Sequence, residues 1–186
     1  MIKRYIIFAG VNGAGKSTLY QTNNQLLDMP RINVDEIVRE YGDWQNIKNV
    51  ISAGKIALRK INNFFDNNIS FNQETTLCGK SILKNIKRAV DLGYKIELYY
   101  VGLDSVETAI QRVKIRVEAG GHGIPEKDIE RRYYESLKQL KIILPLCDRV
   151  EIYDNTKVFT KVAGFEKGNC IMKCNEIPNW SKPIIS

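Results

Sequence analysis

The sequence has a single histidine and only four cysteines, which are scattered along the chain. A structural zinc site needs four thiolate or imidazole ligands at close spacings. Cys170 and Cys174 are four residues apart, but neither a second pair nor a nearby histidine accompanies them. The sequence therefore predicts no metal site built from cysteine and histidine, and the thiols are expected to be reduced, as in the cytoplasm.

Long hydrophobic runs are also missing. No apolar stretch approaches the ~20 residues of a membrane-spanning helix. Residues Met1–Arg4 lead directly into an apolar run, so no cleavable signal peptide is expected. Linkers, repeats and low-complexity segments are absent from the sequence as well. We therefore expect residues 1–186 to form one cytoplasmic domain with a sizeable core and no membrane contact.

The net charge is +7, from 28 basic and 21 acidic residues. Such an excess fits a nucleic-acid-binding protein. It also fits a protein that handles polyanionic nucleotides and carries lysine and arginine around its cleft. Because the basic residues are dispersed and form no long run, the sequence favours the second explanation, and a nucleic-acid partner is not expected.

One motif organises the rest of the chain. Residues Gly10–Ser17 fit G-x-x-x-x-G-K-[ST], the pattern of a phosphate-binding loop. The preceding run Tyr5–Ala9 is short, apolar and β-prone, which is typical of a buried parallel strand. The segment 16–27 is predicted to be a helix. A strand, a glycine turn and a helix are the context that this motif requires; the alternative is a chance glycine turn with an exposed lysine.

The loop predicts how a nucleotide would be held. Its glycines let successive backbone amides turn inward and form an anion-binding nest, and the following helix points its positive end at the same place. Lys16 would reach the β- and γ-phosphates, and Ser17 would supply a hydroxyl to Mg²⁺. The residues expected to bind the nucleotide are Gly10, Asn12, Gly13, Ala14, Gly15, Lys16, Ser17 and Thr18.

Strands and helices are predicted to alternate up to about residue 155. Further strands are expected at 31–35, 69–73, 95–102 and 149–154, with helices at 36–41, 44–67, 81–92, 105–117 and 126–144. This alternation predicts an α/β fold with a parallel sheet and helices on both faces. The last part of the chain, about 156–186, is predicted to be a small β-ribbon.

Two acidic residues follow predicted strands. Asp35 and Glu74 would lie at the carboxyl ends of their strands, where open α/β sheets bind ligands. Asp35 is a candidate general base toward an acceptor hydroxyl, although it could also cap the helix that follows. Glu74, with Thr75 beside it, is a candidate to contact the acceptor, the alternative being a plain surface carboxylate.

Basic residues surround a glycine turn in the segment 112–132, which we expect to act as a lid. Arg112 and Arg116 share one helix face, and Arg131 and Arg132 follow the turn, Arg131 being the candidate for the substrate. Arginines on a closing lid would bring positive charge to the phosphates, whereas an ordinary solvated helix face is the alternative. His122 lies in the turn, where it either touches the substrate or faces solvent.

Together these motifs resemble the zeta-toxin family of small kinases over about residues 1–155. The matching segments are Gly10–Ser17, Ile32–Ile37, Phe71–Leu77, Arg112-Val113 with Arg116-Val117, Gly120–Pro125 and Arg131–Tyr133.

The resemblance implies a P-loop fold of the nucleoside-monophosphate-kinase branch. It also implies phosphorylation of a UDP-activated amino sugar, UDP-N-acetylglucosamine, with ATP or GTP and Mg²⁺, and a small antitoxin as partner. By the same resemblance Asp35 is the base, Glu74 contacts the sugar, and lid arginines bind phosphate. Catalytic roles fall to Lys16, Asp35, Arg112 and Arg116, and acceptor contacts to Glu74, Thr75, His122 and Arg131.

The chain departs from the family in two respects. It lacks the long C-terminal extension of the larger toxins, and a Gly-Gly-His turn replaces a basic lid residue, so that His122 becomes a candidate for that role while Arg112 and Arg116 compete for another. These differences bear on the acceptor more than on the kinase chemistry. A nucleotide or polynucleotide kinase, and a nucleotide-dependent binding module without phosphotransfer, are the alternative functions.

Overall fold

Strands alternate with helices along most of the chain, as the hydrophobic pattern predicts. The computed structural model describes residues 2–23, 28–42 and 44–185. The strands are β1 (Arg4–Gly10), β2 (Arg31–Ile32), β3 (Phe71–Thr75), β4 (Lys95–Gly102), β5 (Arg149–Asp154), β6 (Thr160–Glu166) and β7 (Asn169–Lys173). The helices are α1 (Lys16–Gln21), α2 (Val34–Tyr41), α3 (Ile47–Asp66), α4 (Lys80–Asp91), α5 (Val106–Glu118), α6 (Glu126–Ile143) and α7 (Lys182–Ile185), with a 3-10 turn at Leu144–Leu146.

All of these strands belong to a single sheet in the order β2-β3-β1-β4-β5-β6-β7. The strands β2 to β5 run parallel, so their carboxyl ends meet at one edge, while β6 and β7 are antiparallel. The predicted C-terminal ribbon is therefore part of the main sheet. Val162, Ala163 and Phe165 of β6 are buried in the core, which explains why the hairpin docks on β5.

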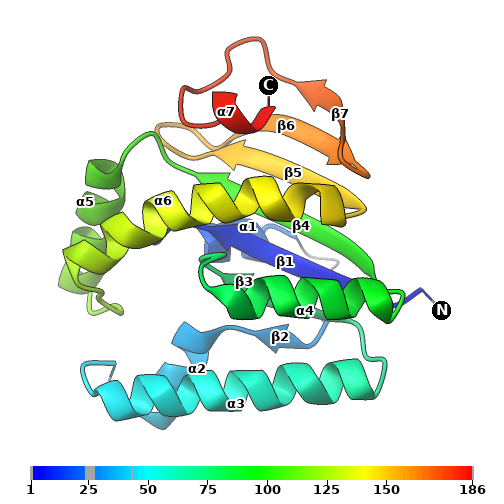
Figure 1. Ribbon diagram of the computed structural model, residues 1–186. Coiled ribbons are helices and arrows are strands. Elements are labelled where there is room, and N and C mark those ends of the chain that lie inside the picture. The colour runs from blue at the N-terminus through cyan, green and yellow to red at the C-terminus, as the bar shows by residue number, and fades with distance from the viewer. Residues whose placement is uncertain (1, 24–27, 43, 186) are drawn as a thin grey trace.

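Side chains of the central strands alternate between the two faces of the sheet. Tyr5 and Ile7 of β1 pack into the cluster that contains the buried residues of α3, α4 and the end of α6. Ile6 and Phe8 pack on the opposite face with residues of α1 and α5. Figure 1 shows α4 and α6 on the face turned toward the viewer. The predicted parallel sheet with helices on both faces is thus confirmed.

The predicted strand 31–35 is wrong in its second half. The backbone leaves the sheet after Ile32, and Asn33 caps α2 by accepting a hydrogen bond from the Asp35 amide at 3.0 Å. An asparagine at this position satisfies a free amide of the first helical turn. Asp35 therefore lies in the first turn of α2, and its carboxylate projects from a helix instead of a strand end.

Two predicted helices also differ from the structure. α1 ends at Gln21, and residues 24–27 of the predicted helix lie outside the described residues. In α3 the buried side chains are Ala53, Ala57, Ile61 and Phe65, spaced at four residues. Near the start of α3, Val50 packs against the core cluster, whereas Ile47 and Ile51 are 67% and 51% exposed. Within the described part of the chain, no helix is long and apolar enough to cross a membrane.

A carboxylate that is nearly buried on the sheet gives the fold a pH dependence. Burial acts to raise the pKa of Glu151, but hydrogen bonds from Tyr153, Lys161 and Arg149 outweigh it, and the pKa is lowered from its ordinary value of 4.5. As pH falls, the unfolded chain binds this proton first. The stability from Glu151 is therefore fully present above about pH 4.5 and is lost as pH falls through the folded-state pKa.

We expect Glu151→Gln to destabilise the protein by about 1–2 kcal/mol near neutral pH. Breaking a fully buried pair costs ~3–5 kcal/mol, and the partial exposure of Arg149 and Lys161 reduces the effect. Urea unfolding at about pH 7 and about pH 3.5 would show the difference shrink in acid. Glu130→Gln, at an exposed position on α6, is the control. A difference that does not change with pH would contradict this assignment.

Candidate active site

The glycine turn between β1 and α1 has the predicted geometry. Gly10, Gly13 and Gly15 have φ of 142°, 77° and 97°, a region that L side chains rarely adopt. At Gly10 a Cβ would also lie 2.1 Å from the Val101 carbonyl oxygen. The glycines are therefore required by the backbone itself, and the strand–turn–helix context expected for a phosphate-binding loop is confirmed.

Lys16 is the most buried charged residue of the loop, at 8% exposure. Its Nζ donates a hydrogen bond to the Val11 carbonyl at 3.0 Å. Burial lowers the pKa of Lys16, while the nearby carboxylates of Glu74 and Asp35 oppose this shift. The cation is thus held inside the turn, facing two acidic residues.

Two cavities adjoin this turn. The first, which we call the loop cavity, has a volume of about 400 Å³. It is lined by Gly13, Gly15, Lys16, Ser17, Thr18, Gln21, Asn33, Asp35, Glu36, Arg39, Glu74, Arg112 and Arg116. The predicted nucleotide-binding residues Gly13 and Gly15 to Thr18 are therefore together. Gly10 and Ala14 are not among the residues that line this cavity.

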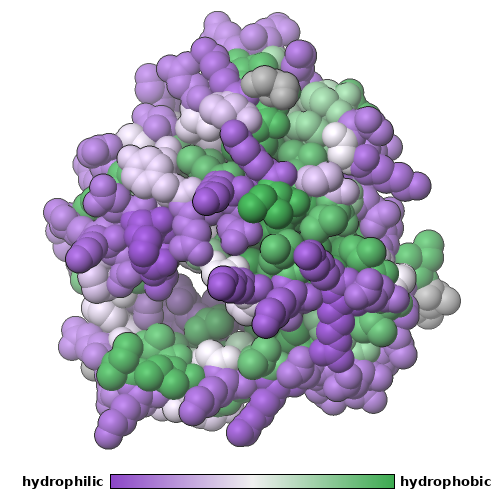
Figure 2. Space-filling model, viewed as in Figure 1, coloured by the Kyte–Doolittle hydropathy of each residue, from purple (hydrophilic) through white to green (hydrophobic). Residues whose placement is uncertain are grey.

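The second, which we call the helix cavity, has a volume of about 410 Å³ and lies beside α3 and α4. Figure 2 shows the corresponding face hollowed between α3 and α6. One wall is apolar and comes from Val34, Val38, Val50, Gly54, Ala57, Leu58 and Ile61. The polar wall comes from Gln73, Glu74, Thr75, Thr76, Ser81 and Asn85, with Asn12, Arg116, His122 and Arg132 at the loop end. Asn12, predicted at the nucleotide, thus faces this cavity instead.

The two cavities meet at a small set of polar side chains. The residues that line both are Lys16, Asn33, Asp35, Glu74 and Arg116. Two cations, two carboxylates and an amide therefore stand at the junction. Four of these were selected from the sequence as site residues; Asn33 was not, although an asparagine three residues before Glu36 is a capping signal.

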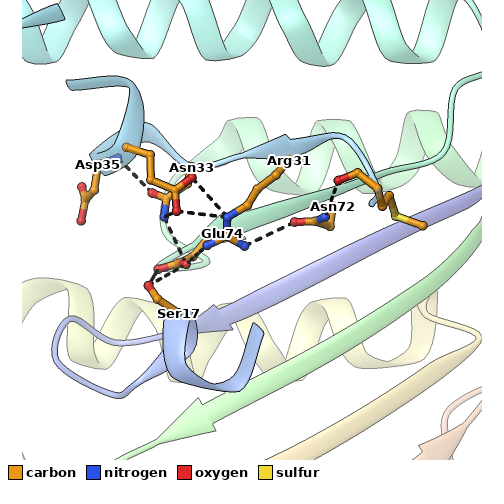
Figure 3. A network of polar contacts seen from close by, with 8 residues as sticks. Ser17, Arg31, Asn33, Asp35, Asn72 and Glu74 are labelled. Carbon is orange, nitrogen blue, oxygen red and sulfur yellow. Dashed lines mark hydrogen bonds and ion pairs between the residues drawn. The ribbon is translucent and has the colours of Figure 1, made fainter. Parts of the chain in front are cut away.

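Glu74 is the centre of the polar network in Figure 3. Its carboxylate accepts hydrogen bonds from Ser17 Oγ at 2.9 Å, Arg31 Nη2 at 2.6 Å and Asn33 Nδ2 at 3.2 Å. The Arg31 guanidinium also lies 3.6 Å from the centroid of the Tyr20 ring. The carboxylate is therefore fixed toward Ser17. Arg31 was missed by sequence reasoning because a basic residue beginning a two-residue strand carries no pattern.

Asp35 faces His122 across the junction. Its Oδ1 lies 3.9 Å from His122 Nε2, and the Asp35 side chain is 36% exposed. Burial lowers the pKa of His122, with Asp35 opposing the shift, so the imidazole is neutral near pH 7. Trp44 packs against the imidazole at 5.2 Å between ring centroids. His122 is thus held in the site, on the side of the acidic residue.

The arginines of the predicted lid separate into distinct positions. Arg116 lines both cavities, and its buried Nε and Nη2 have no hydrogen-bond partner among the described residues. Arg112 lines the loop cavity and donates from Nη2 to the Thr156 carbonyl at 3.0 Å. A buried guanidinium without a partner is costly, so Arg116 indicates a site for an anion.

Arg131 does not reach either cavity in the described structure. It is 56% exposed and pairs with Asp128 at 3.1 Å and Glu135 at 2.9 Å. Its neighbour Arg132 lines the helix cavity instead. Successive residues on a helix point about 100° apart, so of the two arginines after the glycine turn it is Arg132 that lines the cavity, and not Arg131, for which the acceptor contact was predicted.

A metal ion would find oxygen ligands beside the loop. The described residues contain no group of three or more His, Cys, Asp or Glu side chains that could hold a metal. The Ser17 hydroxyl and the Glu74 carboxylate, 2.9 Å apart, nevertheless offer oxygen donors at the loop cavity. Mg²⁺ usually takes one or two protein oxygens and completes its shell with phosphate and water, so these residues fit it.

The fold and this site define a kinase-like P-loop protein with a nucleotide-binding turn. The family model described as zeta toxin matches residues 3–161. The chain belongs to the zeta toxin family. An uncharacterised protein of Haemophilus influenzae is 34% identical over 133 residues, which are 72% of this chain and 94% of that protein.

Solved structures share the fold at low identity. Structures of the AvrRxo1-ORF1:AvrRxo1-ORF2 complex with sulphate ions and with ATP have TM-scores of 0.75 and 0.73 at 13% identity. Each match covers 100% of this chain, which spans 64% of the matched chain. The PezAT toxin–antitoxin system of Streptococcus pneumoniae matches with a TM-score of 0.62 at 16% identity, over 92% of this chain and 70% of the other.

Proposed function

We propose that this protein transfers the γ-phosphate of ATP or GTP to a hydroxyl of a small acceptor. The observation that carries the proposal is the junction of the two cavities, where Lys16, Arg116, Asp35 and Glu74 line both. A donor in one cavity and an acceptor in the other would meet at these charges. Phosphoryl transfer depends on such positioning and on cations around the transferred group.

The loop cavity is the proposed donor site. The inward-facing turn and Lys16 would hold the β- and γ-phosphates, as expected for this motif. Ser17 and Glu74 would hold Mg²⁺, which when bound neutralises phosphate charge. Membership of the zeta toxin family and the ATP complex of the AvrRxo1 proteins support a nucleotide here.

The helix cavity is the proposed acceptor site. It joins an apolar wall to a polar one, which suits a sugar nucleotide such as UDP-N-acetylglucosamine, the acceptor implied by the family. In the proposed step the acceptor hydroxyl oxygen bonds to the γ-phosphorus. Its proton passes to the Asp35 carboxylate, and the bond to the bridging oxygen breaks, leaving its electron pair on ADP. Arg116 stabilises the charge on the transferring group.

A small antitoxin is the proposed protein partner. The PezAT neighbour is a toxin–antitoxin system, and the AvrRxo1 neighbour is a complex of two proteins. Nucleic acid is not proposed as a partner, because the basic residues are dispersed along the sequence and form no long run.

The two neighbouring arginines of α6 provide a test of the acceptor site. Arg132→Ala should raise the acceptor KM about tenfold, because Arg132 lines the helix cavity and a lost hydrogen bond to a charged group costs ~1.5–3 kcal/mol. Arg131→Ala should leave the KM within about twofold, because its partners are Asp128 and Glu135 on its own helix. Steady-state kinetics of both variants would measure the acceptor KM. A larger rise in KM for Arg131→Ala than for Arg132→Ala would reverse the assignment.

Product identification tests the function itself. The protein would be incubated with Mg²⁺ and γ-labelled ATP or GTP, first with UDP-N-acetylglucosamine and then with a pool of metabolites. Labelled UDP-N-acetylglucosamine supports the full proposal, and another labelled metabolite replaces the acceptor while keeping the kinase. Labelled oligonucleotide, with binding that falls steeply with salt, would establish a polynucleotide kinase instead. Nucleotide binding without any labelled product would indicate a nucleotide-dependent binding module without phosphotransfer.

A further inference from the structure

The C-terminal segment docks at the end of β5, beyond residue 161 where the family match stops. Trp180 is 8% exposed, and Ser181 is fully buried. The indole lies directly over Gly102 of β4, where a Cβ would be 2.2 Å from the ring atom Cη2. The tail therefore occupies a socket that only a glycine leaves open. Figure 1 shows α7, which follows directly, beside β6.

The indole of Trp180 is hydrogen-bonded to Asp154, the last residue of β5. Trp180 Nε1 donates to Asp154 Oδ1 at 2.8 Å. The same oxygen accepts from Thr156 Oγ1 at 2.7 Å, and the Thr156 amide donates to Asp154 Oδ2 at 3.2 Å. The Asp104 amide, in turn, donates to Thr156 Oγ1 at 3.0 Å. Asp154 is thus the link between the tail and the turn of residues 154–156.

This turn contacts the phosphate-binding loop and one residue of the loop cavity. Asn155 Nδ2 donates to the Ala14 carbonyl at 2.8 Å, inside the phosphate-binding loop. The Thr156 carbonyl accepts from Arg112 Nη2 at 3.0 Å, and Arg112 lines the loop cavity. A series of contacts, made of these hydrogen bonds and the backbone of residues 154–156, therefore connects the indole of Trp180 to the phosphate-binding loop and to Arg112.

We propose that Trp180 is a positioning residue for the nucleotide. By fixing Asp154 it holds the turn of residues 154–156, which in turn orients the phosphate-binding loop and Arg112. The inference rests on the proposed function only in assigning the nucleotide to the loop cavity. Sites held in place before binding lose less entropy when the ligand binds. Loosening this series should therefore lower the affinity for the nucleotide and leave the affinity for the acceptor unchanged.

Trp180→Phe in the full chain is the test, since it keeps a buried aromatic ring and removes the Nε1 donor, although the ring left in the socket is smaller. We expect the Kd for ATP, measured by titration calorimetry, to rise about five- to tenfold, the scale of the net contribution of one typical intramolecular hydrogen bond. Ile185→Val, a buried change in the same segment without a contact to Asp154, is the matched control and should leave this Kd unchanged.

A double variant separates positioning from loss of stability. Thr156→Val removes the hydroxyl of the next link, so its effect on the ATP Kd should not add to that of Trp180→Phe, because both interrupt one series. Additive effects, or a Kd that stays the same while Tm falls, would overturn the inference. If the wild type binds ATP but transfers no phosphate, the proposed function fails and the comparison of variants stands. A wild type that binds no ATP overturns both.

Discussion

We expect Asp35→Asn to lower the rate of the proposed phosphoryl transfer by about 10²-fold or more, the usual contribution of a general base. Nucleotide binding should stay close to that of the wild type, because Asn keeps the shape of the side chain and the α2 cap depends on Asn33. The reason for a base at this position is the geometry. Asp35 lines both cavities and is 36% exposed, so a hydroxyl in the helix cavity can approach it.

Single-turnover kinetics together with calorimetry would separate the two quantities. Glu36→Gln is a useful comparison, since Glu36 follows Asp35 in the same helical turn and lines only the loop cavity. An unchanged transfer rate in Asp35→Asn would remove Asp35 from the mechanism. A loss of ATP affinity equal to the loss of rate would instead make it part of the donor site.

Arg116→Met gives a second large effect, in opposite directions for activity and stability. Phosphoryl transfer should fall by about 10³-fold, the lower end of the contribution of an arginine at the transferring group. Without ligand, however, the variant should be more stable than the wild type. Nε and Nη2 of Arg116 are buried without partners in the described structure, and methionine removes that unpaired polarity while filling similar space.

The stability gain should be about 1 kcal/mol, which corresponds to a rise in Tm of ~2–4 °C for a chain of this size. Differential scanning calorimetry without nucleotide would measure it. Lys114→Met is the matched control on the same helix, because Lys114 is 62% exposed and pairs with Glu126 at the surface. A lower Tm for Arg116→Met would mean that Arg116 is a structural residue and not a reserved anion site.

Sequence reasoning found the parts of the site that are carried by local pattern. The glycine turn is specified by spacing alone, because each glycine is required by its own backbone angle. Glu74 was predicted because it comes directly after a segment in which polar and apolar residues alternate. In the structure it lies near the carboxyl end of β3. Asp35 was found for a partly wrong reason, since the helix that carries it starts at Val34, one residue before the predicted end of the strand.

What the sequence could not show depends on contacts between distant segments. Arg31 acquires its role from Glu74, more than forty residues later in the chain, and from the ring of Tyr20. Arg132 instead of Arg131 reaches the cavity because of the rotation of α6 on the core, which a charge pattern does not record. The tail joined the main sheet because β5 offered a free edge, and pairing across chain distance has no signature in a single sequence.

The chain has two tryptophans, and the fold places one near each end of the proposed reaction path. Trp44 packs against His122 of the helix cavity. Trp180 is hydrogen-bonded to Asp154, which begins the turn beside the phosphate-binding loop. With either indole replaced by phenylalanine, the other becomes the single tryptophan fluorophore of the chain. Arrival of donor and arrival of acceptor could then be followed as separate optical signals in an unlabelled protein.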